Sequence, residues 1–158
     1  MTISDLLVLF DRWNYKKKKI HTDKKSIFVK ERHIVFITMG QNIGFEQNGK
    51  GEEFLRPVIV YKKFNNNQFL GIPLTSQEKS GKYYFEFSYQ NNKKSYAILS
   101  QLRVFDTKRV KYKSGTIRTE DYAKLILEVI KVVTPQKEES PEGIYTETIP
   151  VNQKSVKP

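Results

Sequence analysis

Arg56 is the residue of this sequence whose type and setting best suit chemistry on a phosphate. It stands just before Pro57, where extended backbone is favoured, and its guanidinium is a permanent cation with a planar fork that matches phosphate oxygens. The next apolar run ends at Leu74-Thr75, so a hydroxyl donor closes that strand-like segment. The two strand ends can meet at one site, whereas a salt bridge between Arg56 and a nearby glutamate is the purely structural alternative.

A polar, glycine-bearing loop over residues 41–55 leads into Arg56 and is long for a passive connector, which favours a functional role. It has no G-x-x-x-x-G-K-[ST] motif and no helical pattern after it, which excludes a phosphate-gripping P-loop. Its candidates for a binding site are Glu46, Gln47 and Lys50, whereas Glu46, Glu52 or Glu53 could close the salt bridge with Arg56.

Hydrophobic periodicity predicts a mainly β fold with a helix near each end. The predicted strands cover residues 26–39, 57–64, 68–74, 83–89 and 95–104. A helix over 119–133, capped by Thr119 and stopped by Pro135, is the clearest single element. Its apolar side chains form one stripe: Tyr122, Leu125, Ile126, Val129, Ile130 and Val133.

The first helix is predicted over residues 2–14 and runs into the lysine cluster Lys16 to Lys19. Its amphipathic pattern fits either a membrane-surface element or a short helix packed on the domain. Asp5 and Asp11 favour packing on the domain, because carboxylates would face anionic lipid unfavourably. The lysines can still help to hold a polyanion.

The segment 83–89 alternates aromatic and other side chains with the period of two that is typical of a strand. Two interpretations remain open for its rings, which either stack on bases of a nucleic acid or fill the core. The rings in question are Tyr83, Phe85, Phe87 and Tyr89.

Composition restricts the partners more than it restricts the chemistry. The 158 residues carry a formal net charge of +11, which favours an acidic partner such as nucleic acid, an acidic protein or an anionic membrane surface. The sequence has no cysteine and no apolar run long enough to span a membrane, so we expect a soluble, cytoplasmic protein. We expect a helix and basic linker over 1–25, one domain over 26–134 and a proline-rich, disordered tail over 135–158.

Four short motifs occur in an order and spacing that resemble the PemK/MazF family of toxins from type II toxin-antitoxin systems. The resemblance covers roughly residues 31–133. The motifs are Asn42-Ile43-Gly44-Phe45-Glu46-Gln47, Arg56-Pro57-Val58-Ile59-Val60, Ile72-Pro73-Leu74-Thr75 and the segment from Ser100 to Arg109. The chain departs from the short form of the family in its N-terminal helix, its enlarged loop before Arg56 and its tail.

The resemblance implies an SH3-like small β-barrel of five to seven strands with helices, and a homodimer. It implies a metal-independent, sequence-specific endoribonuclease that needs no cofactor, acts on single-stranded RNA and is inhibited by an acidic antitoxin. Arg56 matches the catalytic arginine of the family, Thr75 its catalytic threonine, and Glu46 the acidic residue of the G-x-E-Q loop. The side chains expected to contact RNA are Gln47, Lys50, Ser76, Gln77 and Lys79.

The chemistry expected is attack of the RNA 2'-OH on the adjacent phosphate, which needs charge stabilisation and two proton transfers. Arg56 would contact the scissile phosphate and Thr75 would donate to a non-bridging oxygen. Either Arg56 or Glu46 takes the 2'-OH proton, although a guanidinium is ordinarily a poor acceptor. Glu46 has two alternative roles, which are to orient Arg56 or only to order the loop.

Two functions of other classes remain open: a non-catalytic SH3-like module that binds nucleic acid or an acidic peptide, and a toxin of related fold that poisons a protein target. The two histidines, His21 and His33, are the minimum for a histidine-pair ribonuclease, but each has an ordinary surface or strand-end explanation.

Overall fold

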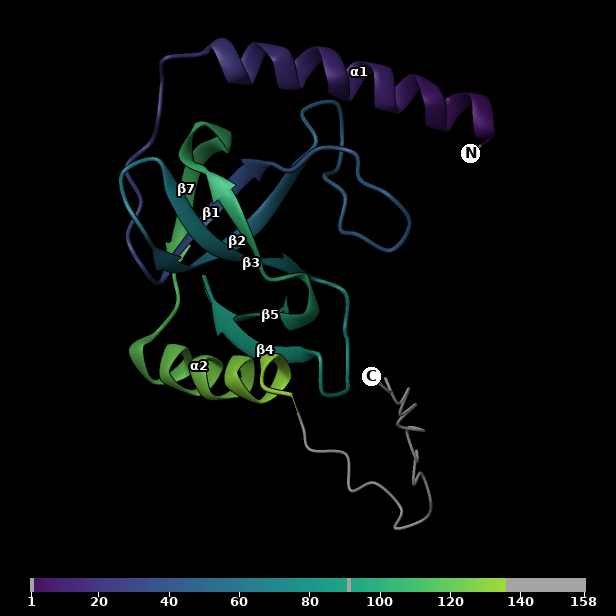
Figure 1. The fold of residues 1–158 in the computed structure, drawn as a ribbon. Coiled ribbons are helices and arrows are strands. Elements are labelled where there is room, and N and C mark those ends of the chain that lie inside the picture. The colour runs from purple at the N-terminus through teal and green to yellow at the C-terminus, as the bar shows by residue number, and fades with distance from the viewer. Residues whose placement is uncertain (1, 91, 136–158) are drawn as a thin grey trace, which may run out of the picture.

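The computed structural model describes residues 2–90 and 92–135 as seven strands with one helix before them and one after (Figure 1). The predicted tail beyond Pro135 lies outside the described residues. In chain order the elements are α1 (Ile3–Thr22), β1 (His33–Thr38), β2 (Leu55–Lys63), β3 (Gln68–Thr75), β4 (Tyr84–Tyr89), β5 (Lys93–Ile98), the 3₁₀ turn η1 (Leu99–Gln101), β6 (Arg103–Asp106), the 3₁₀ turn η2 (Thr107–Arg109), β7 (Val110–Thr116) and α2 (Thr119–Val133).

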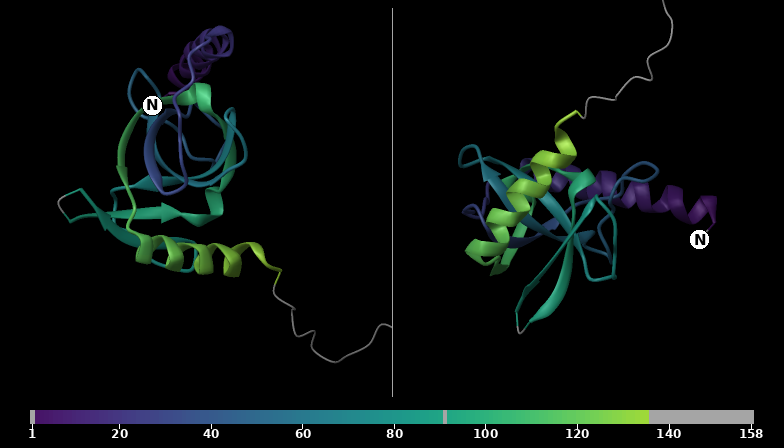
Figure 2. Two further views of the ribbon diagram at one scale, coloured as in Figure 1. Left: turned by 90° about the vertical axis from the view of Figure 1, so that its left-hand side faces the viewer. Right: turned by 90° about the horizontal axis from the view of Figure 1, so that it is seen from below.

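The strands form one antiparallel, strongly curled sheet with the order β4-β5-β3-β2-β1-β7, and β6 pairs with β3 beside this path. Seen end on, the strands form a ring with α2 along one side and α1 on the opposite side (Figure 2). Among the described residues no ladder joins β4 to β7, so the ring is not closed by hydrogen bonds. The expected mainly β fold of up to seven strands with a helix at each end is confirmed, with an open sheet in place of a closed barrel.

The central strand β2 is buried on both faces, which explains its continuous apolar run. Val58 and Val60 enter one core inside the curled sheet, together with Val35 of β1 and Phe69 of β3. Ile59, between them, enters a second core that α2 covers. Full burial of a side chain of this size stabilises the fold by roughly 2 kcal/mol, so β2 and β3 form a rigid base for the residues at their ends.

Helix α1 is about one and a half times as long as the predicted helix over residues 2–14. The lysine cluster continues the helix to Thr22 instead of ending it. Lysine is a good helix former, and a capping box between Thr2 and Asp5 fixes the first turn. The predicted strand over 26–39 is shorter than expected, since only His33–Thr38 pairs with neighbours. No described helix is both long and apolar enough to cross a membrane.

Two further boundaries differ from prediction in the second half of the chain. The turn η1 divides the expected strand over 95–104 into β5 and β6, which pair with successive parts of the same edge of β3, opposite β2. Strand β7 has no counterpart among the predicted strands, because its segment VKYKSGT is polar and mostly exposed and has no apolar alternation. As an edge strand paired only with β1, β7 needs no second buried face.

Helix α2 begins at the predicted Thr119, although Arg118 and not Thr119 holds the capping position. Leu125 and Val129 of its stripe are buried, whereas Ile130 is 50% exposed and Val133 is 56% exposed.

The aromatic strand β4 supports the core interpretation for most of its rings. Phe87 is buried, Phe85 and Tyr89 pack against the same core, and Tyr83 remains exposed.

Candidate active site

Arg56 and Thr75 lie at adjacent ends of paired strands. In the antiparallel β2–β3 ladder Val58 is paired with Pro73, and Arg56 and Thr75 each lie two residues beyond this last pair, at the same end of the ladder. Residues directly opposite in an antiparallel pair point to the same face. Both side chains accordingly line one pocket of about 520 Å³. The strand ends predicted to meet at a site do meet.

Two backbone carbonyls hold the Arg56 guanidinium, which is 9% exposed. Its Nε donates to the carbonyl of Asn48 at 2.5 Å, and its Nη1 donates to the carbonyl of Leu74 at 3.1 Å. A guanidinium has five N–H groups, so three remain for a ligand. Burial lowers the pKa of Arg56 from its ordinary value, because the charged form is less well solvated inside the fold.

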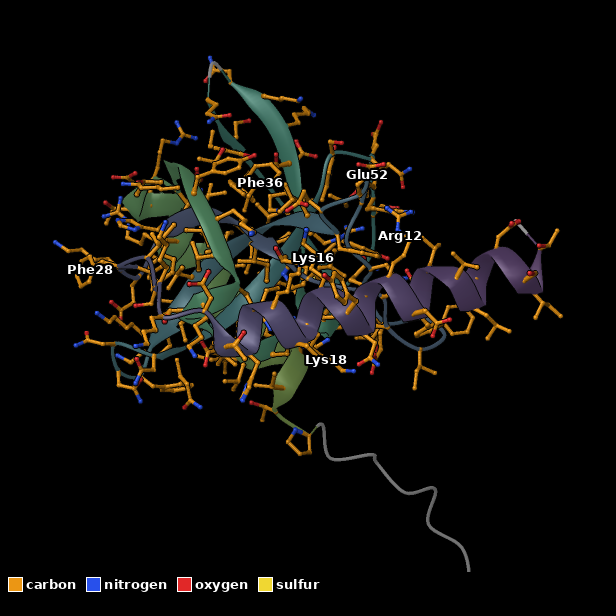
Figure 3. The ribbon with its side chains drawn as sticks, turned by 90° about the horizontal axis from the view of Figure 1, so that it is seen from above. Arg12, Lys16, Lys18, Phe28, Phe36 and Glu52 are labelled. Atoms are coloured by element: carbon orange, nitrogen blue, oxygen red, sulfur yellow. The ribbon has the colours of Figure 1, made fainter. Side chains whose placement is uncertain are left out.

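The salt-bridge alternative for Arg56 is not what the structure contains, since no described ion pair includes it. Two of the three glutamates considered for it face helix α1: Glu53 pairs with Lys16, and Glu52 lies 4.0 Å from Arg12. Figure 3 shows Arg12 and Lys16 on the side of α1 that faces Glu52. The positive charge of Arg56 is therefore directed into the pocket without a carboxylate partner.

The charged side chains that line this pocket are all basic, and among the described residues no carboxylate or imidazole lines it. Lys50 and Lys93 add two cations to Arg56, and Ser76 adds a hydroxyl beside Thr75. Thr75 Oγ1 accepts a hydrogen bond from the backbone N–H of Gln77 at 3.2 Å, which leaves its own O–H free to donate to a ligand. The arrangement suits a phosphodiester, which offers negative oxygens and needs donors.

Six further residues line the pocket, of which five were not considered as site residues and one, Tyr89, was a ring with two open roles. They come from β1, β7 and the β4–β5 hairpin, and they are Phe36, Ser114, Tyr89, Gln90, Lys93 and Ser95. The Gln90 amide donates to the carbonyl of Ser114 and, at 3.0 Å, to its Oγ, which fastens the hairpin to β7. Apart from Tyr89 in its alternating strand, no local pattern distinguishes these residues, because only the curl of the sheet brings them beside Arg56.

Glu46 does not line the pocket of Arg56. Its Oε2 accepts a hydrogen bond from the backbone N–H of Ile43 at 3.4 Å, and it lines a separate pocket beneath α1. Gln47 is held through its backbone, whose N–H donates to Gln101 Oε1 at 3.1 Å and whose carbonyl accepts from Asn42 Nδ2 at 2.7 Å. The structure thus places the G-x-E-Q residues as an ordered loop beside the pocket rather than inside it.

The remaining residues expected to contact RNA are divided between two locations. Lys50 and Ser76 line the pocket, with Lys50 anchored through its backbone pair with Leu55. Gln77 and Lys79 are exposed on the following loop and are not part of the lining. Of the five residues, two share the pocket with Arg56 and Thr75.

Helix α1 packs against both ends of the loop that supports Arg56. Trp13, 6% exposed, is the buried anchor, and its ring lies 5.7 Å from that of Phe54 near the end of the loop. It also covers Gly40 at the start of the loop, so closely that a Cβ on Gly40 would lie 2.2 Å from the indole. The loop is thereby fixed at both ends, and its Asn48 carbonyl is held against Arg56.

Over residues 30–133 the sequence matches the family described as PemK-like, MazF-like toxin of type II toxin-antitoxin system. The chain belongs to this family. Both strands that carry Arg56 and Thr75 lie within the matched range, whereas α1 precedes it. A search of curated protein sequences found no match to the chain.

Two solved structures of similar fold come from Deinococcus radiodurans. The chain is similar to the crystal structure of MazF (Form-I) with a TM-score of 0.54 and 15% identity, over 67% of this chain and 96% of that one. It is similar to MazE-MazF (Form-II) with a TM-score of 0.51 and 11% identity, over 67% of this chain and 95% of that one. At these identities the likeness concerns the fold alone.

Proposed function

We propose that this toxin is an endoribonuclease that cleaves single-stranded RNA by attack of a 2'-OH on the adjacent phosphate, without a metal ion. The observation that carries the proposal is the shared pocket of Arg56 and Thr75, whose cations have no carboxylate beside them. Membership of the MazF-like toxin family supports the same activity.

Arg56 and Thr75 act on the phosphate as negative charge develops on it. Three N–H groups of Arg56 remain after its two carbonyl contacts, enough to grip two non-bridging oxygens. Because the two carbonyls fix the guanidinium before RNA binds, little reorganisation is needed at the moment of reaction. The free O–H of Thr75 donates from the neighbouring strand.

We assign the proton acceptor to Arg56 rather than to Glu46. The neutral form of Arg56 takes the 2'-OH proton on a nitrogen that the two carbonyls leave free, and the resulting guanidinium cation stabilises the charged phosphate and returns a proton to the leaving 5'-oxygen. No carboxylate or imidazole lines the pocket within the part of the chain that the structure describes, and Glu46 faces a different pocket. Burial lowers the pKa of Arg56, which is the direction that proton acceptance requires. The role of Glu46 is then to order the loop through the N–H of Ile43.

Replacing Glu46 with glutamine tests this assignment. We expect the acidic limb of the pH–rate profile to be unchanged and kcat to fall by less than about tenfold, since general-base catalysis typically contributes a hundredfold or more. The measurement is kcat/KM on one RNA across pH 5 to 10. Loss of the acidic limb in Glu46→Gln would restore the carboxylate as the base and contradict the assignment to Arg56.

Replacing Thr75 with valine removes the hydroxyl and keeps the branched shape. We expect kcat to fall about a hundredfold, because one donor to the developing charge is lost, with little change in melting temperature. Ser76→Ala, a change of the adjacent hydroxyl in the same pocket, is the matched control and should alter kcat by only a few-fold. Equal losses in both variants would mean that Thr75 has no special place at the phosphate.

Incubation of the purified protein with mixed single-stranded RNA in excess EDTA tests the activity itself. Fragments with 2',3'-cyclic phosphate and 5'-OH ends are the expected products. Binding without cleavage would instead support a non-catalytic SH3-like module that holds nucleic acid through the same basic pocket. Mapping the ends on a long RNA then gives the cleavage sequence.

An acidic antitoxin and a second copy of the chain complete the proposal. The net charge of +11 favours an acidic inhibitor segment, and the similar Deinococcus protein is described in a MazE-MazF structure. We expect the antitoxin to compete with RNA for the pocket of Arg56. We expect a homodimer by the family resemblance, and light scattering measures it directly.

A further inference from the structure

A second pocket, of about 530 Å³, lies between α1 and the first part of the loop over residues 41–55. One wall comes from α1 and includes Phe10, Asp11 and Lys17. The opposite wall comes from the loop, from Arg103 at the start of β6 and from Arg109 of η2. Because α1 precedes the range that matches the family, this pocket depends on a part of the chain that the family match does not cover.

Three cations line this pocket, and none of them forms an ion pair with a carboxylate among the described residues. They are Lys17, Arg103 and Arg109. Arg109 donates to the carbonyls of Thr38 and Met39 at 3.2 and 3.1 Å, so its position is fixed. Burial, together with the charge of Arg103, lowers the pKa of Arg109. Two guanidinium groups that repel each other favour binding of an anion.

The pocket also contains groups that a simple anion would not use. Asp11 and Glu46 add two carboxylates, which would repel an isolated phosphate. The half-buried ring of Phe10 adds an aromatic face. A nucleotide uses all three, because its phosphate binds cations, the amino groups of its base donate to carboxylates, and its base stacks on a ring.

We infer that this pocket is a second RNA subsite. It binds one nucleotide of a single-stranded RNA, at a distance along the RNA from the cleaved bond. The inference rests on the proposed function, because the same loop borders both pockets. Residues 41–43 and Glu46 of the loop line the second pocket, and Lys50 and Gly51 line the pocket of Arg56. An RNA strand held at Arg56 passes over the loop into the pocket beneath α1, so RNA longer than a few nucleotides binds more tightly.

Trp13 allows the subsite to be observed directly, because it is the only tryptophan of the chain and it lines this pocket. We would titrate the full-length protein with 2'-O-methylated RNA, which has no free 2'-OH and is not cut, in lengths of three and twelve nucleotides. We expect the longer RNA to change the Trp13 emission and the shorter RNA, held at Arg56, to leave it unchanged. Fluorescence anisotropy of labelled RNA measures total binding in parallel.

Lys17 and Lys18 form a matched pair of variants, since they are adjacent exposed lysines of α1 and only Lys17 lines the pocket. We expect Lys17→Gln to weaken binding of the longer RNA roughly fivefold, the size of one partly exposed charge contact. The slope of log affinity against log salt should fall by about 0.7, the value for one phosphate contact to a single strand. Lys18→Gln should leave the slope unchanged, and Arg103→Gln should behave like Lys17→Gln.

An unchanged Trp13 emission while anisotropy shows binding of the longer RNA would overturn the inference. So would equal salt slopes for Lys17→Gln and Lys18→Gln. A response of Trp13 to a glutamate-rich peptide but not to RNA would assign the pocket to an acidic protein instead. Cleavage of unmodified RNA in EDTA is scored separately, so a protein that binds in this way but does not cut disproves the nuclease and retains the subsite.

Discussion

Replacing Arg56 with alanine is expected to lower kcat on single-stranded RNA by at least about a thousandfold, the largest effect of any single substitution in the pocket. The change removes a positive charge and several N–H donors from the phosphate, and loss of even one such donor typically costs a hundredfold or more. Single-turnover cleavage at saturating protein measures the loss without a contribution from binding. The expected KM changes little, because Lys50 and Lys93 still attract the RNA.

Arg56→Lys separates charge from geometry in the same assay. A lysine keeps the positive charge but cannot satisfy the carbonyls of Asn48 and Leu74 while it also grips a phosphate with a planar fork. We expect it to lose most of the activity that alanine loses. Full activity of Arg56→Lys, with both variants melting as the wild type does, would contradict the proposed role of the guanidinium.

Replacing Gly40 with alanine is expected to give the largest loss of stability, about 3 kcal/mol in the free energy of unfolding. Gly40 has a φ of +101°, a backbone conformation that side chains rarely adopt. A Cβ there would lie 2.2 Å from an indole carbon of Trp13, so the tryptophan and with it α1 must move. Urea denaturation, followed by Trp13 fluorescence, measures the change.

Gly44→Ala is the matched control, because Gly44 lies in the same loop, has a φ of +56° and has open space where its Cβ would be. It bears the backbone cost alone, roughly 1 kcal/mol. Similar losses at the two glycines would show that the contact with Trp13 contributes nothing, and that α1 does not brace the loop. A larger loss at Gly40 supports the packing seen in the structure.

The sequence by itself determined the elements that depend on local pattern. The apolar run of β2 begins at Arg56-Pro57, and that of β3 ends at Thr75. Antiparallel pairing of sequential strands is enough to bring these two positions together. The helix over 119–133 was equally clear, because it has a periodic apolar stripe and a first turn with two carboxylates. Such features need only neighbouring residues in the chain to specify them.

The tertiary structure alone decided which side chains surround Arg56 and Thr75. Phe36, Ser114 and the β4–β5 hairpin complete the pocket only because the sheet curls, and a polar edge strand such as β7 has no hydrophobic pattern to reveal it. Glu46, only ten positions before Arg56, faces a different pocket, because a loop fixed by Gln101 and Trp13 turns it away. Spacing in sequence records the order of groups, whereas packing between distant segments sets the direction in which each side chain points.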